Sequence, residues 1–332
     1  MNNLVYVGKV LQLIPIEGAD RIESAIVVCG EGGKWQGCVL KESFKVGDKC
    51  LVFRQDCIVP EIPEFEHMRK HKFRVRMCRF LKTPSEVLIS GFLPNVPQDL
   101  PVGTDVGAIV RVTKYEKPIP VSMMGETKGN FPGFIPKTDE MNFQAVQDLL
   151  ARVKLQPYWM TLKYDGTSAT YYHNRGEVGV CSRNLEKKLT SNDVYNRINK
   201  EFGVTYKLQE LGKRGFNYAI QGEIFGPNIQ KNRMGAEKIS FRAFDVYDID
   251  AREYLSSQDQ RALLKELDIP MVDIVGMGIW SLEDFEDIRK LGEVKYQNGK
   301  EAEGVVVRVP DFSCTNGSRL SFKILNLNYK GN

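Results

Sequence analysis

The spacing of apolar residues changes about one third of the way along the chain, and this change sets the strongest limit on the fold. Before residue 115, short apolar runs such as Leu4-Val5-Tyr6-Val7 and Cys50-Leu51-Val52-Phe53 are separated by turn-forming clusters such as Gly30-Glu31-Gly32-Gly33. Many short strands with regular turns between them are typical of a small barrel or sandwich. We therefore predict an OB-like β-barrel over residues 1–115.

The rest of the chain mixes strand-like and helical patterns. The stretch 116–140, which contains Lys117-Pro118-Ile119-Pro120, is rich in proline and is predicted to be a linker. A helix is expected to begin near Asn142 and open a second domain over residues 141–332. Further helices are expected at about 192–202, 258–267 and 282–291. The last two begin with Ser257-x-x-Gln260 and Ser281-x-x-Asp284, a capping box and a near variant of one.

Composition narrows the class of protein. The length of 332 residues suggests two domains. No apolar run is long enough for a transmembrane helix, and the N-terminus lacks the pattern of a signal peptide. The seven cysteines form no C-x-x-C pair, which argues against a zinc cluster and fits reduced thiols. We therefore expect a cytoplasmic or nucleoplasmic protein that is neither secreted nor bound to a membrane.

One segment of the predicted barrel is strongly basic. Residues 69–82 contain seven Lys or Arg and no Asp or Glu. Within it, Phe73-Arg74-Val75-Arg76-Met77 alternates strictly, so a strand there would point Phe73, Val75 and Met77 inward and Arg74 and Arg76 outward. Outward arginines on a barrel suit the phosphates of a nucleic acid, although a solvated strand face gives the same pattern.

A series of short motifs follows in the second domain. Lys163-Tyr164-Asp165-Gly166 alone is a weak signal, because a lysine before a tight Asp-Gly turn has the same sequence. Behind it come Ser182-Arg183-Asn184, Gly222-Glu223, the strand Phe241-Arg242-Ala243-Phe244-Asp245-Val246-Tyr247, Glu303-Gly304-Val305-Val306-Val307-Arg308, and Ser321-Phe322-Lys323. Uninterrupted alternation would put Phe241, Ala243, Asp245 and Tyr247 on one face of their strand, and Arg242, Phe244 and Val246 on the other.

Each motif also has a purely structural interpretation. Glu223 and Glu303 could be ordinary charges at strand ends, Phe244 could be a core residue, and Lys323 could extend to solvent. Together, however, an aromatic ring, carboxylates and lysines make a site that can hold a nucleoside triphosphate.

The order of these motifs over residues 163–323 resembles the covalent nucleotidyltransferase superfamily of DNA ligases, RNA ligases and mRNA-capping guanylyltransferases. The resemblance implies an α+β fold, in which the OB-like barrel precedes a nucleotidyltransferase domain, an ATP-grasp-like ligase adenylylation domain with antiparallel sheets and flanking helices. It also implies ATP and a divalent metal, Mg²⁺ or Mn²⁺, as cofactors.

The same resemblance implies roles for the motif residues. Lys163 would be the nucleophile that forms a lysyl-AMP, with its pKa lowered by the metal and by Lys323. Asp165, Glu223 and Glu303 would hold the metal, mainly through water.

The nucleotide itself would be held by four residues. Arg183 would contact the ribose or a phosphate, Glu223 the ribose, Phe244 the adenine ring, and Lys323 the α-phosphate.

Domain order separates the branches of the superfamily. DNA ligases and capping enzymes carry an OB domain after the last lysine motif, whereas this sequence ends nine residues after Lys323 and has its barrel first. This order resembles the nick-sealing RNA ligases of family 5, which implies a monomer that joins a 3′-OH RNA strand to a 5′-phosphate strand on a nicked duplex. Alternatives are a DNA ligase, a capping-type guanylyltransferase, or an inactive relative that only binds nucleic acid.

Two departures from the superfamily pattern are visible. The last motif often has two lysines, but Ser321 occupies the first place here. Ligases often place a glutamate one or two residues before the nucleophile, and these positions are Leu162 and Thr161. The contacts that select the base are therefore expected to come from the backbone.

Overall fold

The computed structural model describes residues 4–30, 33–115, 126–313 and 319–329. The proline-rich Lys117-Pro118-Ile119-Pro120 and Cys314 fall outside the described residues. The chain divides into two compact units, Met1–Pro118 with Phe143–Arg152, and Ile119–Asn142 with Val153–Asn332. Each unit is described by itself.

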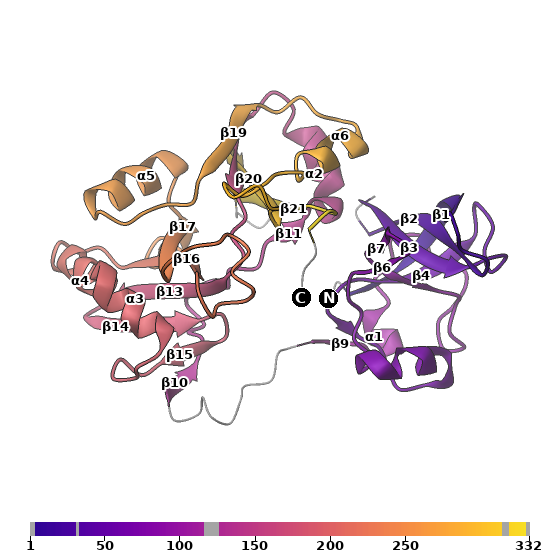
Figure 1. Cartoon of the computed structure of the whole chain (residues 1–332), viewed down its shortest axis with the longest axis horizontal. Coiled ribbons are helices and arrows are strands. Elements are labelled where there is room, and N and C mark those ends of the chain that lie inside the picture. Colours follow the sequence, from indigo (N-terminus) through magenta and orange to yellow (C-terminus); the bar gives the residue numbers. More distant parts are fainter. Residues whose placement is uncertain (1–3, 31–32, 116–125, 314–318, 330–332) are drawn as a thin grey trace. The chain divides into compact units, whose positions relative to one another are not determined.

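The first unit is built on one curled sheet of five strands (Figure 1). Its order is β3 (Gly33–Leu40), β2 (Ile22–Cys29), β1 (Val5–Pro15), β4 (Lys49–Phe53) and β8 (Leu88–Ser90), with every neighbouring pair antiparallel. The long strand β1 has a bulge between Val10 and Gln12, beyond which it continues along β2. A bulge bends a strand and increases its twist, which lets one strand serve both parts of a curled sheet. The predicted OB-like architecture is confirmed.

Shorter elements complete the first unit. They are the strand pairs β5 (Cys57–Ile58) with β9 (Thr113–Lys114) and β6 (Cys78–Phe80) with β7 (Thr83–Ser85), the 3₁₀ segments η1 (Pro63–His71) and η3 (Phe143–Val146), and the helices α1 (Gly107–Val110) and α2 (Gln147–Arg152). Among the described residues of this unit, apolar side chains form two buried clusters. Val5, Leu51 and Phe65 belong to one of them, and Val27 and Trp35 belong to the other.

The strand expected at Phe73–Met77 is wrong. Lys72 and Phe73 both have positive φ angles, 53° and 57°, so the chain turns where an extended strand was expected. Only Arg74 makes an isolated bridge, to Ile58. Phe73 and Val75 are nevertheless buried, because the turn directs both side chains into the core. The alternation therefore predicted the burial of Phe73 and Val75 correctly, but Met77 is only half-buried and the backbone conformation differs.

The segment Phe143–Arg152 groups with the first unit, whereas the sequence analysis assigned it to the second domain. Two contacts explain this grouping. The Gln144 side-chain amide donates to Glu86 Oε1 at 3.0 Å, and both side chains are buried. The backbone of Gln144 also lies against Gly33, since a Cβ atom added to Gly33 would fall 1.6 Å from the Gln144 carbonyl oxygen. The predicted domain boundaries, with a barrel over 1–115, a linker over 116–140 and a second domain over 141–332, stay a prediction.

The second unit contains two sheets. The seven-stranded sheet is antiparallel, in the order β10 (Thr127–Asn130), β15 (Leu185–Lys187), β14 (Glu177–Ser182), β13 (Thr167–Asn174), β16 (Tyr218–Phe225), β17 (Ser240–Asp248) and β18 (Glu253–Tyr254). The five-stranded sheet runs β11 (Met141–Asn142), β21 (Arg319–Leu325), β20 (Gly304–Ser313), β12 (Pro157–Leu162) and β19 (Ile274–Ile279), and β11 with β21 is its parallel pair.

Helices flank these sheets, as predicted. In Figure 1, α3 (Val194–Phe202) and α4 (Val204–Lys213) lie against β13 and β14. No sequence pattern predicted α4, which begins directly after Gly203 ends α3 with a φ of 60°. The other helices are α5 (Ser257–Glu266) and α6 (Phe285–Lys290).

The predicted caps of the last two helices are wrong. Ser256, rather than Ser257, caps α5 by accepting a hydrogen bond from the Asp259 backbone. Asp284 is itself the cap of α6 and not the third residue of its first turn. In both cases the residue that caps is the one whose oxygen reaches the free backbone N–H groups of the first turn.

A bulge in β17 overturns the predicted alternation of Phe241–Tyr247. Gln221 of β16 faces Asp245 and the adjacent Gly222 faces Ala243, so Phe244 is the extra residue. Beyond the bulge the faces exchange, and Val246 joins Phe241 and Ala243 in one buried cluster. Asp245 is therefore on the face opposite to Ala243.

Replacing Gly33 with alanine tests how tightly Gln144 packs on β3. We expect Gly33→Ala to lower the free energy of unfolding by about 1–3 kcal/mol, the range for overpacking, because the new methyl group meets the Gln144 backbone. Thermal unfolding followed by circular dichroism measures this loss. Gly91→Ala is the control, since nothing lies within 4 Å of its added Cβ atom. Equal melting temperatures for the two variants would contradict the close contact.

Candidate active site

The backbone around Lys163 is held at the end of β12. The Lys163 N–H donates to the Gly304 carbonyl at 2.9 Å. The buried Tyr296 hydroxyl donates to the Lys163 carbonyl and accepts from the Glu303 N–H, both at 3.3 Å. One side chain thus connects the nucleophile predicted from Lys163-Tyr164-Asp165-Gly166 to the first residue of the Glu303-Gly304 motif.

The glycine of the first motif has a steric role. A Cβ atom on Gly166 would lie 2.1 Å from the carbonyl oxygen of Ile224 in β16. Thr167 pairs with Ile224 directly afterwards, as β13 begins. Only glycine allows this close approach, which brings Lys163 and Asp165 from one sheet next to Glu223 of the other.

The Lys163 ammonium is surrounded by carboxylates. Its Nζ lies 2.7 Å from Glu303 Oε1, with the two side chains 25% and 26% exposed. Burial alone would lower the pKa of Lys163, but the nearby charges of Glu303, Glu223 and Asp165 outweigh burial and raise it. The residues of the chain by themselves therefore hold Lys163 protonated, whereas the sequence analysis expected an environment that lowers its pKa.

The carboxyl groups of Glu223 and Asp165 are close enough to Lys163 to act on its charge, and their own pKa values are also changed. Burial raises the pKa of Glu223 to about 8, although Lys163 and a hydrogen bond from the Ser168 hydroxyl at 3.2 Å act in the opposite direction. Burial also raises the pKa of Asp165, and a hydrogen bond from Tyr329 opposes that rise. Both groups are placed where an added cation would favour their charged forms.

Lys323 projects from β21 beside this cluster. It pairs with Val306 of β20, the strand that begins directly after Glu303. Burial, followed by the positive charge of Lys163, lowers the pKa of Lys323. The structure thus brings together Lys163, Asp165, Glu223, Glu303 and Lys323, all of which the sequence singled out.

The donor set suits a hard metal ion that keeps part of its water shell. Within the described ranges, no three His, Cys, Asp or Glu side chains converge closely enough to hold a metal by themselves. Mg²⁺ and similar ions usually bind one or two carboxylates together with water and substrate phosphates. The oxygens of Asp165, Glu223 and Glu303 fit that chemistry, and their role as metal ligands stays a prediction.

The other residues predicted to contact the nucleotide, Arg183 and Phe244, contact protein side chains in this structure. Arg183 forms an ion pair with Asp139 at 2.6 Å. Phe244 is half-buried and packs against a cluster that includes Leu162 and Tyr164, the two neighbours of Lys163. Both side chains are therefore close to residues of the motifs, and their contacts to ribose, phosphate and adenine stay predictions.

A buried ion-pair network joins the two sheets, and the sequence analysis missed it. Asp245 of β17 accepts from Arg308 of β20 at 3.2 Å and from Arg319 of β21. Arg308 also donates to the Thr161 hydroxyl at 3.0 Å, and the Arg319 guanidinium lies 4.3 Å from the centre of the Tyr254 ring. Arg319, Ser321 and Lys323 lie on the same face of β21, so the alternation in its sequence could have indicated that Arg319 faces the site.

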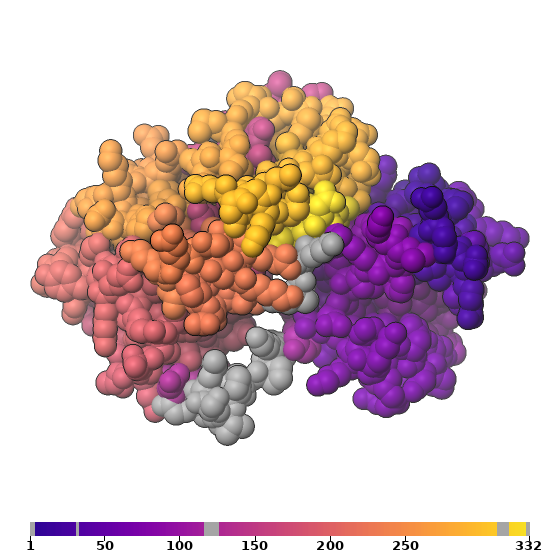
Figure 2. Space-filling model, in the orientation of Figure 1, coloured from indigo at the N-terminus to yellow at the C-terminus, as the bar shows by residue number. Residues whose placement is uncertain are grey.

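Near the end of the chain, Tyr329 was also missed. Its hydroxyl donates to Asp165, and the Arg233 guanidinium lies 4.9 Å from the centre of its ring. The loop that carries Arg233 is fixed by the Asn298 side chain, which donates to the Arg233 carbonyl at 2.8 Å. In Figure 2 this orange loop lies against the golden segment that precedes β20. No motif pointed to Tyr329, because its position depends on the turn after β21.

The two arginines predicted to bind nucleic acid differ in their surroundings. The Arg74 guanidinium lies 2.5 Å from Asp56 Oδ1 and 3.7 Å from the centre of the Tyr115 ring. Arg76 is exposed and contacts the His71 ring at 3.1 Å. Arg74 is therefore already held within its own unit, whereas Arg76 faces solvent.

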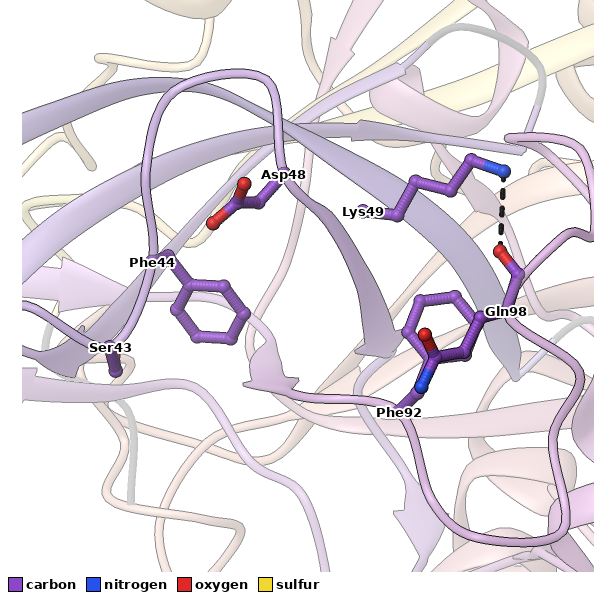
Figure 3. Close-up of a pocket in the computed structure, with 6 residues that line it drawn as sticks. All are labelled: Ser43, Phe44, Asp48, Lys49, Phe92 and Gln98. Carbon is purple, nitrogen blue, oxygen red and sulfur yellow. Dashed lines mark hydrogen bonds between the residues drawn. The ribbon is translucent and has the colours of Figure 1, made fainter.

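A hollow in the first unit contains none of the predicted residues (Figure 3). It is lined by Ser43, Phe44, Asp48, Lys49, Phe92 and Gln98. The Lys49 ammonium donates to the carbonyls of Gln98, Asp99 and Leu100. Since the lysine stabilises a loop and Asp48 would repel phosphate, we assign no ligand to this hollow.

Comparisons with known proteins identify the family. A family model described as RNA ligase matches residues 156–325, just over half of the chain and all of the predicted catalytic residues. The chain belongs to the RNA ligase family. An OB-fold domain model matches residues 4–89, in agreement with the curled sheet of the first unit. Among curated proteins, the search found no match.

Solved structures of Naegleria gruberi RNA ligase are similar over nearly the whole chain. A structure of a point mutant with ATP and Mn is 29% identical, with a TM-score of 0.80, and the match covers 97% of this chain and 95% of that one. The ligase with PPi is 29% identical, with a TM-score of 0.81 and coverage of 98% and 97%. Another mutant with AMP and Mn is 28% identical, with a TM-score of 0.81 and coverage of 97% and 96%.

In the part of the chain that the structure describes, no helix is both long enough and apolar enough to cross a membrane.

Replacing Asp245 with asparagine tests the network between the sheets. We expect Asp245→Asn to lower the free energy of unfolding by about 3–5 kcal/mol, because two buried guanidinium groups would lose their shared carboxylate. The melting temperature of the ligase measures this loss. Glu283→Gln is the control, since its pair with Lys154 is exposed and screened by water and should contribute little to stability. Similar small shifts for both variants would show that the network is not needed for stability.

Proposed function

We propose that this chain is an ATP-dependent RNA ligase that seals a 3′-OH end to a 5′-phosphate end through a lysyl-AMP on Lys163. The observation that carries the proposal is the position of the Lys163 ammonium, 2.7 Å from Glu303 and among Glu223, Asp165 and Lys323. The solved Naegleria ligase structures with ATP and Mn and with PPi support the choice of nucleotide and metal.

In the first step Lys163 attacks the α-phosphorus of ATP. The nitrogen–phosphorus bond forms as the bond to pyrophosphate breaks. Glu303 Oε1, the nearest carboxylate oxygen, is placed to accept the proton that the ammonium must lose. Burial and Lys163 lower the pKa of Lys323, and a bound phosphate would favour its charged form again, so that Lys323 would place a positive charge beside the reacting group. A bound divalent metal would add further positive charge there.

The nucleotide contacts follow from the same face of the site. Phe244 stacks on adenine, Arg183 exchanges Asp139 for a phosphate or ribose oxygen, and Glu223 binds the ribose or a water on the metal. Asp165, Glu223 and Glu303 would supply the oxygen atoms that hold a divalent metal.

Two steps complete the reaction. AMP passes from Lys163 to the 5′-phosphate of the RNA, which frees the lysine. The 3′-OH then attacks the activated phosphate, the phosphodiester forms and AMP leaves.

The partner is a nicked RNA duplex, and the protein acts as a monomer in the cytoplasm or nucleoplasm. Cys38, Cys50, Cys57, Cys78 and Cys181 are free thiols. Burial raises the pKa of Cys57 to about 12, so this thiol is protonated and inert. Such thiols are consistent with a reducing compartment.

Labelling with α-labelled ATP tests the first step. We expect wild-type protein with Mg²⁺ or Mn²⁺ to keep the label on a denaturing gel and Lys163→Ala to show none, because only Lys163 forms the phosphoramidate. Lys154→Ala is the control, an exposed lysine of the same unit that pairs with Glu283. An unlabelled wild type, or equal label on Lys163→Ala, would contradict the proposal. Label from GTP alone would indicate a guanylyltransferase.

The two basic-segment arginines should behave differently toward RNA. We expect Arg76→Gln to weaken binding of a nicked RNA duplex by about three- to ten-fold and to reduce the salt slope by about one, as for one lost phosphate contact. Arg74→Gln should instead lower the melting temperature, because Asp56 and Tyr115 lose their partner. Fluorescence anisotropy and thermal unfolding measure the two effects. An Arg74→Gln protein that melts normally but binds RNA as poorly as Arg76→Gln would refute this assignment.

A further inference from the structure

The hairpin of β6 and β7 has an unusual turn. Phe80 pairs with Thr83, so Leu81 and Lys82 form the whole turn, with φ angles of 46° and 74°. Two-residue turns with positive φ at both positions strongly favour Asn-Gly, because a larger side chain meets its own backbone there. A leucine and a lysine in these positions therefore store strain, and such strain is concentrated at functional sites.

The strained turn exposes apolar surface. Phe80 is 42% exposed and Leu81 is 59% exposed. The base of the hairpin is anchored, since the Cys38 N–H of β3 donates to the Ser85 hydroxyl at 3.0 Å and the Glu86 N–H donates to the Gln36 carbonyl at 2.7 Å. The two apolar side chains are thus presented on an anchored hairpin and do not belong to either buried cluster of this unit.

Positive charge surrounds this apolar tip. Arg79 and Lys82 flank Phe80 and Leu81 in the sequence, and the segment 69–82 that ends here contains no carboxylate. Arg76 and Lys82 are exposed. An aromatic ring between cations complements a nucleic acid strand, because the ring stacks on a base while the cations contact its phosphates.

We propose that the hairpin tip Arg79–Lys82 is an RNA-binding element. Phe80 and Leu81 pack against a base that is exposed at a strand end or at the nick, and Arg79 and Lys82 contact the phosphates on either side. The inference rests on the proposed RNA-joining function, and it names the hairpin tip of the first unit as an element that binds the RNA.

A pair of matched leucine variants tests the element. Leu155 is the control, an exposed leucine of the second unit with a positive φ of 67° and 71% exposure. Asparagine tolerates positive φ better than leucine, so Leu81→Asn and Leu155→Asn should both keep or raise the melting temperature. We expect Leu81→Asn to weaken binding of a fluorescent nicked RNA duplex by about five- to ten-fold and Leu155→Asn to leave it unchanged. Equal affinities for the two variants would overturn the proposal.

Two further variants keep the test independent of folding and of the proposed reaction. Phe80→Ser should weaken RNA binding about ten-fold, the lower range for one stacked base. Lys82→Gly should suit the turn and reduce the salt slope of binding by about one. Both should keep wild-type labelling by α-labelled ATP, so an unlabelled wild type would overturn the proposed function and not this inference. Lost self-association with unchanged RNA affinity would show a protein contact instead and overturn it.

Discussion

The ion pairs of Asp245 with Arg308 and Arg319 set the geometry on which the site depends. Asp245 belongs to the seven-stranded sheet and both arginines belong to the five-stranded sheet. The site needs side chains from both sheets close together. Glu223 comes from the seven-stranded sheet, and Lys163, Glu303 and Lys323 come from strands or strand ends of the five-stranded sheet. Charges buried away from water interact strongly but must be paired, so this network tolerates little change in the separation of the sheets.

The charge balance around Lys163 explains how the nucleophile is held before reaction. Its carboxylate neighbours keep the lysine protonated, and a protonated amine cannot attack a phosphate. In the proposed reaction, a divalent metal held by the same carboxylates would offset their negative charge and so favour the neutral amine of Lys163.

The first unit shows how function can depend on backbone conformation that a sequence pattern hides. The alternation of Phe73–Met77 predicted the burial of Phe73 and Val75 correctly, but it also predicted a buried Met77 and a strand where the chain turns. The turn is fixed by the positive φ angles of Lys72 and Phe73 and by the pairing of Arg74 with Asp56. Consequently Arg74 stabilises the unit, and the exposed charge lies on Arg76 and on the hairpin tip beyond it.

The sequence by itself determined the order of the motifs, the barrel followed by the mixed domain, and the identity of five residues that meet at the site. These features depend on residue type and spacing, which are local properties of the chain. The tertiary structure decided the rest. The bulge at Phe244 turns Asp245 to its arginine partners, and the turn after β21 brings Tyr329 to Asp165. Both contacts join residues more than sixty positions apart, so their partners are chosen by packing and buried charge, which no local pattern contains.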